Sequence, residues 1–323
     1  MDWYEPDTRW NLYTTSREDF VNKFVVEGKF HNNVPQDIVN SFKTATYLLA
    51  HSYYHWPMID EAMSKVLLIL EMTIKLKAKQ LDIPLEKKTK NNRTIKKRLV
   101  DIIDAVFKKE DLQFLKADFN RARNLRNIKM HPERLFYMGA MGFTDANARL
   151  FVNTINLLFL DTKKLKALQS KIECIEANLQ PFKTGLQVLE FQNKKILIDG
   201  FYMFKYREFN TNKLLMLYLN PLTTKVQEQF VEHKYTEPLV LTFTDFEIKE
   251  DSIEGVDLDG KPIKIYTNDK EQNLKTYYDY NEALSKVSES DINTFVNSNS
   301  SKALWQMERI VYENCWVEES LIG

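Results

Sequence analysis

The stretch that decides the fold of the N-terminal half runs from Met58 to Gln80 and reads MIDEAMSKVLLILEMTIKLKAKQ. Its apolar side chains recur with the spacing of one helix face, at positions 59, 63, 66, 67, 70 and 74. Glu71 interrupts this apolar run beside Lys75, and we expect a structural role for it. A long helix with one apolar face must bury that face against other helices, so the stretch predicts a helical bundle.

The segments on both sides of this stretch carry helical signals as well. Ser16, with Asp19 three residues further on, is typical of the capping box at a helix N-terminus. The polar run 82–93 is expected to be a loop, after which Thr94 is expected to cap the next helix. Helices are therefore predicted over residues 16–26, 35–49, 58–80, 94–107, 114–131 and 144–178.

Beyond Pro181 the chain changes to short stretches rich in β-branched and aromatic residues. The pair Asp259-Gly260 lies between two alternating runs, which is typical of a β-hairpin turn. Strands are predicted over 186–191, 195–198, 201–206, 213–219 and 239–246, and helices over 281–287 and 302–315. The sequence thus predicts an α+β fold, with an N-terminal all-α helical bundle (1–180) and a β-rich C-terminal domain with a helical tail (181–323).

The bulk composition is that of a globular protein with room for two domains. The chain has 323 residues, of which 44% are hydrophobic and 28% charged. Cys174 and Cys315 lie far apart and match no metal-ligand spacing, which suits a reducing compartment. No secretory signal is recognisable at the N-terminus, and the longest apolar run, Val66–Leu70, is too short to span a bilayer. We therefore expect a cytoplasmic protein without membrane contact.

A net charge of zero conceals a strong asymmetry along the chain. Residues 87–134 contain 15 Lys/Arg against 6 Asp/Glu, whereas residues 235–323 contain 8 against 18. A compact basic segment attracts polyanions even in a neutral molecule. The alternative is a solvated, lysine-rich helix surface.

The basic segment contains the run Arg126-Asn127-Ile128-Lys129-Met130-His131. Arg123, Asn127 and His131 recur every fourth residue with Arg126 beside them, so they project from neighbouring positions near one end of the predicted helix. Pro132 disfavours helical geometry at His131 and is expected to end the helix there. The opposite stripe of this helix is apolar, which gathers the polar groups on one side.

This arrangement resembles the Arg-x4–6-His signature of HEPN domains. Arg126-Asn127-xxx-His131 follows a helical hairpin and precedes another long apolar helix, and the resemblance covers about residues 35–165. Some HEPN toxins carry a tyrosine two residues after the histidine, where this chain has Glu133. A nucleotidyltransferase partner that modifies such a tyrosine is therefore not expected. The C-terminal domain is not covered by the resemblance.

The resemblance implies a metal-independent endoribonuclease whose composite site forms in a homodimer through the HEPN-like bundle. His131 would act as general acid/base, and Arg126 would hold the scissile phosphate. Asn127 would orient the motif, while Arg123 and Lys129 would contact the RNA. The RNA 2′-hydroxyl would be the nucleophile, so the reaction would need neither metal nor other cofactor. By analogy with the family, the protein would be a toxin or antiviral defence effector.

Other readings of the same residues stay open. His131 would equally suit a helix C-cap, and Arg126 would suit an ion pair with Asp118, Glu133 or another acid. The bundle would then be a non-catalytic module that binds RNA or nucleotide, or a protein that assembles with a partner. For residues 181–323 we expect a sensing or regulatory module that takes a ligand or partner. The phosphate loop, the Gly-x-Ser-x-Gly elbow, His-Glu-x-x-His and Cys-x-x-Cys are absent from the sequence.

Overall fold

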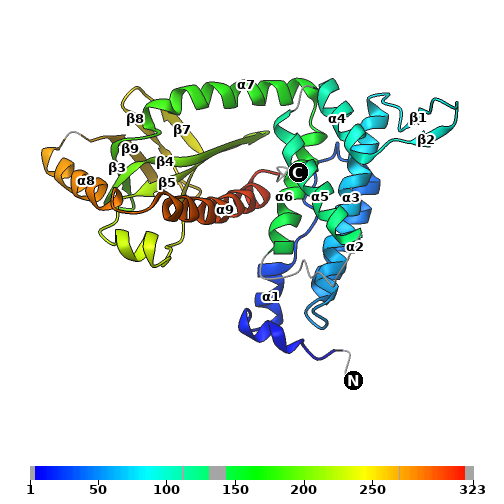
Figure 1. The fold of residues 1–323 in the computed structure, drawn as a ribbon, viewed down its shortest axis with the longest axis horizontal. Helices are drawn as coiled ribbons and strands as arrows, with labels where there is room; N and C mark the ends of the chain where they lie inside the picture. The colour runs from blue at the N-terminus through cyan, green and yellow to red at the C-terminus, as the bar shows by residue number, and fades with distance from the viewer. Residues whose placement is uncertain (1–3, 111–112, 131–142, 269, 317–323) are drawn as a thin grey trace, which may run out of the picture. The chain divides into compact units, whose positions relative to one another are not determined.

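The computed structural model describes residues 4–110, 113–130, 143–268 and 270–316. The chain divides into two compact units, one of Met1–Thr162 with Trp316–Gly323 and one of Lys163–Cys315. The sequence-based boundary at 180/181 therefore lies later than the boundary between the units. The fold is α+β, as predicted, with helices in the first unit and an antiparallel sheet in the second (Figure 1).

The first unit is a bundle organised around one central helix. Its described helices are η1 (Thr8–Leu12), α1 (Arg17–Phe24), α2 (Gln36–His51), α3 (Met58–Gln80), α4 (Leu99–Glu110), α5 (Gln113–Met130) and α6 (Phe143–Leu158). The predicted bounds of α3 are confirmed, and α3 packs against α2, α4, α5 and α6. At α1, the Oγ of Ser16 accepts a hydrogen bond of 3.1 Å from the backbone N–H of Asp19, which confirms the predicted cap.

Helix α6 is buried on nearly all sides, and its polar side chains are therefore paired. The amide of Asn156 accepts a hydrogen bond from the His31 N–H (3.1 Å) and donates one to the Lys29 carbonyl (2.8 Å). Asn153 accepts a bond of 2.7 Å from the indole N–H of Trp316. Buried polar groups are costly unless they are bonded in this way. These amides attach two segments distant in sequence, one N-terminal and one C-terminal, to the bundle.

Three predictions in this region are wrong. The run 82–93, expected to be a loop, contains strand β1 (Glu86–Lys88). Its partner β2 (Thr94–Lys96) occupies the expected start of the next helix, so α4 begins at Leu99 rather than at Thr94. All six strand side chains are exposed, so the alternation of buried and exposed residues that marks a strand is missing. The single helix expected over 144–178 is interrupted at 159–161, and α7 (Thr162–Leu179) lies in the second unit.

The second unit is built on a seven-stranded antiparallel sheet with the order β6-β5-β4-β3-β9-β8-β7. Its strands are β3 (Leu186–Phe191), β4 (Lys194–Phe209), β5 (Asn212–Pro221), β6 (Leu239–Phe243), β7 (Asp245–Ile248), β8 (Ser252–Val256) and β9 (Pro262–Thr267). Only Thr244 separates β6 from β7, yet these strands form the two ends of the sheet order. The sheet must therefore curl so that its ends approach each other. The segment predicted as one strand, 239–246, is divided at this point.

Strand β4 combines two predicted strands into one. Its pairing with β5 is shifted between Ile198 and Met203, which marks an irregularity within a continuous strand. Gly200 lies there with φ +64°, and a Cβ at this position would lie 2.2 Å from the Lys183 carbonyl oxygen. Only glycine fits such a close approach of two backbone segments.

Helices cover one part of the sheet. They are η2 (Gln180–Phe182), η3 (Gln227–Val231), α8 (Glu271–Leu284) and α9 (Glu289–Asn314), and both helices of the tail are longer than predicted. Helix α9 packs on β4, β5, β6 and η3. Phe295 of α9 joins Phe230 and Tyr280 in a buried cluster beneath it. None of the helices in the described part of the chain combines the length and apolar character that a membrane span requires.

Candidate functional site

Arg126 of α5, a predicted site residue, faces the middle of α3. The Nε of Arg126 lies 3.5 Å from the Oε2 of Glu71, and the other oxygen of this carboxylate lies 2.5 Å from the Nζ of Lys75. The side chains of Arg126 and Glu71 are only 31% and 18% exposed. The sequence left open an ion pair between Arg126 and an acid. The structure contains such a pair, and the acid is Glu71.

The local sequence of α5 explains this position. Leu115, Phe119 and Ala122 are buried and attach one stripe of α5 to the bundle, with the rings of Phe119 and Phe107 5.4 Å apart. Arg123 directly follows this stripe, and Arg126 lies one turn further along the helix. Both arginines therefore extend along an apolar wall rather than into open solvent.

The arginines and Glu71 line a small cavity whose other walls are apolar. Its volume is about 10 Å³, and its apolar lining is Leu67, Leu70, Ile74, Leu99, Ile103, Phe119 and Ala122. This space is about that of a single water molecule. A larger polar ligand would have to bind at its mouth, where the guanidinium groups end.

Three charged atoms in this cavity lack hydrogen-bond partners. The Nε of Arg123, the Nε of Arg126 and the Oε2 of Glu71 are buried without a hydrogen bond to any described residue. The terminal nitrogens bond only to adjacent side chains, at 3.1 Å from Arg123 to Asn124 and 3.4 Å from Arg126 to Asn127. Buried charged groups without full hydrogen bonding are costly. The terminal nitrogens of the two guanidinium groups thus keep donor capacity for an oxyanion at the mouth of the cavity.

The other predicted residues differ in their surroundings. Asn127 is exposed beside Arg126. Lys129, expected to contact RNA, donates a hydrogen bond of 2.5 Å to the carbonyl of Asp60 and lies 3.9 Å from Glu61. Its ammonium group ties α5 to the first turn of α3. Asp60 lies 69 residues earlier in the chain, so this contact leaves no local signal in the sequence. His131 lies outside the described residues.

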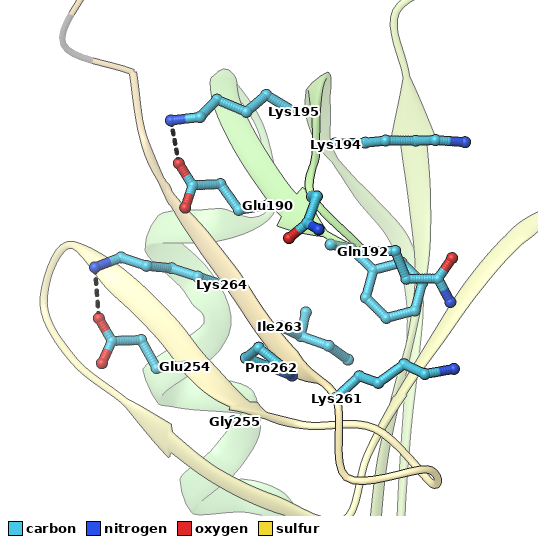
Figure 2. Close-up of a pocket in the computed structure, with 12 residues that line it drawn as sticks. Glu190, Gln192, Lys194, Lys195, Glu254, Gly255, Lys261, Pro262, Ile263 and Lys264 are labelled. Carbon is cyan, nitrogen blue, oxygen red and sulfur yellow. Dashed lines mark ion pairs between the residues drawn. The ribbon is translucent and has the colours of Figure 1, made fainter.

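The second unit contains a larger pocket, of about 1040 Å³, between the β3–β4 turn and strands β8 and β9 (Figure 2). Two ion pairs cross its wall, Lys195 with Glu190 and Lys264 with Glu254, the latter at 2.7 Å. Lys249 and Lys264 hold the pKa of the Glu254 carboxyl at about 2. These lysines are therefore neutralised by fixed partners within a cross-strand charge ladder.

Two further lysines of this pocket point away from the ladder. Figure 2 shows Lys194 and Lys261 extending to the same side, with Gln192 between them. Lys261 forms an exposed ion pair of 3.0 Å with Asp259, whereas Lys194 has no ion pair with a described residue. This side of the pocket could receive a small anion.

Within the described ranges, no three or more His, Cys, Asp or Glu side chains gather in a way that could hold a metal ion. Comparison of the chain with protein-family models, with curated proteins and with solved structures gave no match.

Proposed function

We propose that the helical unit is one half of a homodimeric, metal-independent endoribonuclease of HEPN type. The observation that carries this proposal is the pair of half-buried guanidinium groups, Arg123 and Arg126, whose terminal nitrogens bond only to adjacent side chains among the described residues. Guanidinium groups bind phosphate through paired N–H donors, and RNA presents one phosphate per nucleotide. Asn127 beside Arg126, and His131 at the position required by the motif, supply the remaining groups.

The proposed reaction is a transesterification of the RNA strand. The 2′-oxygen attacks the phosphorus, and its proton passes to His131 of one subunit. The bond from phosphorus to the 5′-oxygen breaks, and the partner subunit's His131 gives a proton to this leaving oxygen. The products are a 2′,3′-cyclic phosphate and a 5′-hydroxyl. Arg126 stabilises the negative charge that develops on the phosphoryl oxygens.

Glu71 acts as the resting partner of Arg126 in this proposal. Its Oε2 lies 3.5 Å from the Arg126 Nε, and both atoms are buried. This ion pair keeps the guanidinium against the α3 surface, while the terminal nitrogens of Arg126 remain open to a phosphate at the mouth of the cavity. Glu71 is thus a positioning residue rather than a catalytic one.

The test is cleavage of total RNA in excess EDTA by the wild type, Arg126→Ala and His131→Ala. We expect cleavage that survives chelation and falls by about 100-fold or more in both variants. Arg17→Ala is the control, because Arg17 is exposed and contacts only the Tyr54 ring, 5.8 Å away, among the described interactions. It should cleave like the wild type.

Failure of the wild type to cleave under any condition would overturn the enzyme proposal. Salt-sensitive binding without cleavage would identify a non-catalytic RNA-binding module. No affinity for RNA would point to a protein that assembles with a partner. The dimer is tested by the molecular mass in solution.

We propose a toxin or antiviral defence role in the cytoplasm, with residues 181–323 as the regulatory module. What supports the regulatory part is the pocket on the side of Lys194, where a small anionic ligand would meet an ammonium group that has no ion pair with a described residue, beside the exposed pair of Lys261 and Asp259. Ligand-dependent cleavage that disappears in Lys194→Gln would support this assignment, and unchanged regulation in that variant would contradict it.

A further inference from the structure

The hairpin of β1 and β2 is the most basic element among the described residues of the helical unit. Residues 86–97 contain six Lys/Arg and a single acid, Glu86. The turn is closed by a hydrogen bond of 2.8 Å from the Thr89 N–H to the Arg93 carbonyl, with Asn92 at φ +55°. Figure 1 shows the hairpin projecting from the ends of α3 and α4. Its cations are thus displayed on a small, defined scaffold.

Most of these cations have no counter-charge. Lys87 lies 3.6 Å from Asp101, which also binds Arg98 at 2.8 Å. The remaining five form no ion pair with any described residue; they are Lys88, Lys90, Arg93, Lys96 and Lys97. In the pocket of the second unit, by contrast, three of the four lysines are paired.

The hairpin also contributes nothing visible to the core. Every side chain of its two strands is exposed, and a two-stranded hairpin is marginally stable by itself. Like charges gathered on such an element repel one another and weaken it further. An external polyanion would remove this repulsion, so the hairpin is better explained by a partner than by the fold.

A groove connects the hairpin to the arginine site. It has a volume of about 400 Å³ and is lined by Leu68, Glu71, Met72, Lys75, Leu76, Lys79 and Leu85. Glu71 lines both this groove and the cavity of Arg123 and Arg126. Leu85 lies at the base of the hairpin, where its carbonyl accepts a hydrogen bond of 2.8 Å from the Lys97 N–H. The groove therefore leads from the site to the hairpin over about 12 Å of α3, from Glu71 to Lys79.

We propose that the hairpin and this groove form an arm that binds the backbone of single-stranded RNA and leads it to Arg126. The destination of the strand rests on the proposed function, whereas the binding does not. Lys75 is paired with Glu71, but Lys79 forms no ion pair with a described residue and continues the positive charge along the groove. Leu68, which is 50% exposed, adds an apolar floor for the sugars and bases. The lining contains no aromatic ring on which bases could stack, so binding is dominated by phosphate contacts and is independent of sequence.

The experiment compares two variants of equal charge in the full chain. The arm variant changes to glutamine the residues Lys88, Lys90, Arg93 and Lys96. The control changes to glutamine four exposed lysines of the second unit, which are Lys213, Lys225, Lys275 and Lys302. The probe is a labelled single-stranded RNA of mixed sequence, and the readout is its Kd by fluorescence anisotropy between 50 and 300 mM salt. Circular dichroism confirms that both variants are folded.

We expect the arm variant to raise Kd about 10- to 100-fold at 0.1 M salt. The slope of log Kd against log salt should fall by about 2 to 3, because each lost phosphate contact on a single strand removes roughly 0.7. An unchanged Kd, or an equal loss in the control variant, would overturn the arm. Tighter binding of a duplex of the same length would overturn the assignment to single strands.

Cleavage kinetics separate this inference from the proposed function. The arm variant should raise KM and leave kcat unchanged, because it removes binding remote from the reacting phosphate. If the wild type binds RNA through the arm but never cleaves it, the enzyme proposal fails and the arm stands. If the wild type cleaves and the arm variant keeps its KM and Kd, the arm fails and the enzyme proposal stands.

Discussion

The ion pair between Lys205 of β4 and Glu308 of α9 gives a sharp test of how the second unit is held together. The two side chains are only 13% and 4% exposed, and the carboxylate accepts a hydrogen bond from the ammonium group. Removing one member of a buried pair leaves an uncompensated charge, which costs roughly 3–5 kcal/mol. The residual exposure of Lys205 lets water approach, so we take about 3 kcal/mol for Lys205→Met. For a unit of the size of Lys163–Cys315, that loss lowers Tm by about 6–12 °C.

The double variant Lys205→Met/Glu308→Leu should recover at least half of that loss, because both charges are replaced by apolar side chains of similar volume. The assay is urea unfolding followed by circular dichroism, with m-values compared between variants. Lys286→Met is the matched control, since its pair with Glu282 is exposed (64% and 71%), and its Tm should not change. The buried pair would be refuted if the double variant lost as much free energy of unfolding as Lys205→Met and Glu308→Leu together. It would also be refuted if Lys205→Met lost as little as the control Lys286→Met.

Three further predictions concern a buried hydrogen bond, a glycine with positive φ and a buried thiol. Trp316→Phe removes the 2.7 Å hydrogen bond to Asn153 and should lower the free energy of unfolding by about 1–3 kcal/mol, measured in urea; an unchanged midpoint would contradict it. Gly200→Ala should cost about 1–3 kcal/mol or more, because φ is +64° and the added Cβ meets a backbone oxygen, and a neutral effect in thermal unfolding would exclude this geometry. Burial raises the pKa of the Cys315 thiol to about 12, so one equivalent of thiol reagent should react at pH 8, at the exposed Cys174, and the second only in denaturant. Because the thiolate is disfavoured in the folded state, stability should also fall as pH rises above about 9; rapid reaction of both thiols in the native protein would contradict the burial.

The candidate site divides into a part that sequence could supply and a part that it could not. The motif places Arg126 and Asn127 together because they are consecutive in the chain, and the helix period places Arg123 one turn before them. The partner of Arg126 is 55 residues earlier in the chain, and only the packing of α5 on α3 brings Glu71 to it. Likewise, the sequence alone indicates a surface cation at Lys129, and only the packing of α5 on α3 brings its ammonium group to the carbonyl of Asp60.

Sequence by itself determined the elements whose signals are local. The bounds of α3, the Ser16 cap and strand β3 follow from helical period, side-chain capping and β-branched composition over a few residues. The same local rules failed at the 86–96 hairpin, because strands that bury nothing leave no alternating pattern. They failed again at Gly200, where glycine is required because the backbone at Lys183, 17 residues earlier in the chain, approaches too closely for a side chain.

The tertiary structure decided what depends on contacts between distant segments. The order of the sheet places β6 and β7 at opposite ends although one residue separates them, and no local preference specifies such an arrangement. The burial of Lys205 with Glu308 and the attachment of Trp316 to the helical unit have the same origin. In each case the free energy depends on the burial and pairing of groups that meet only after the chain has folded, so it is absent from any short stretch of sequence.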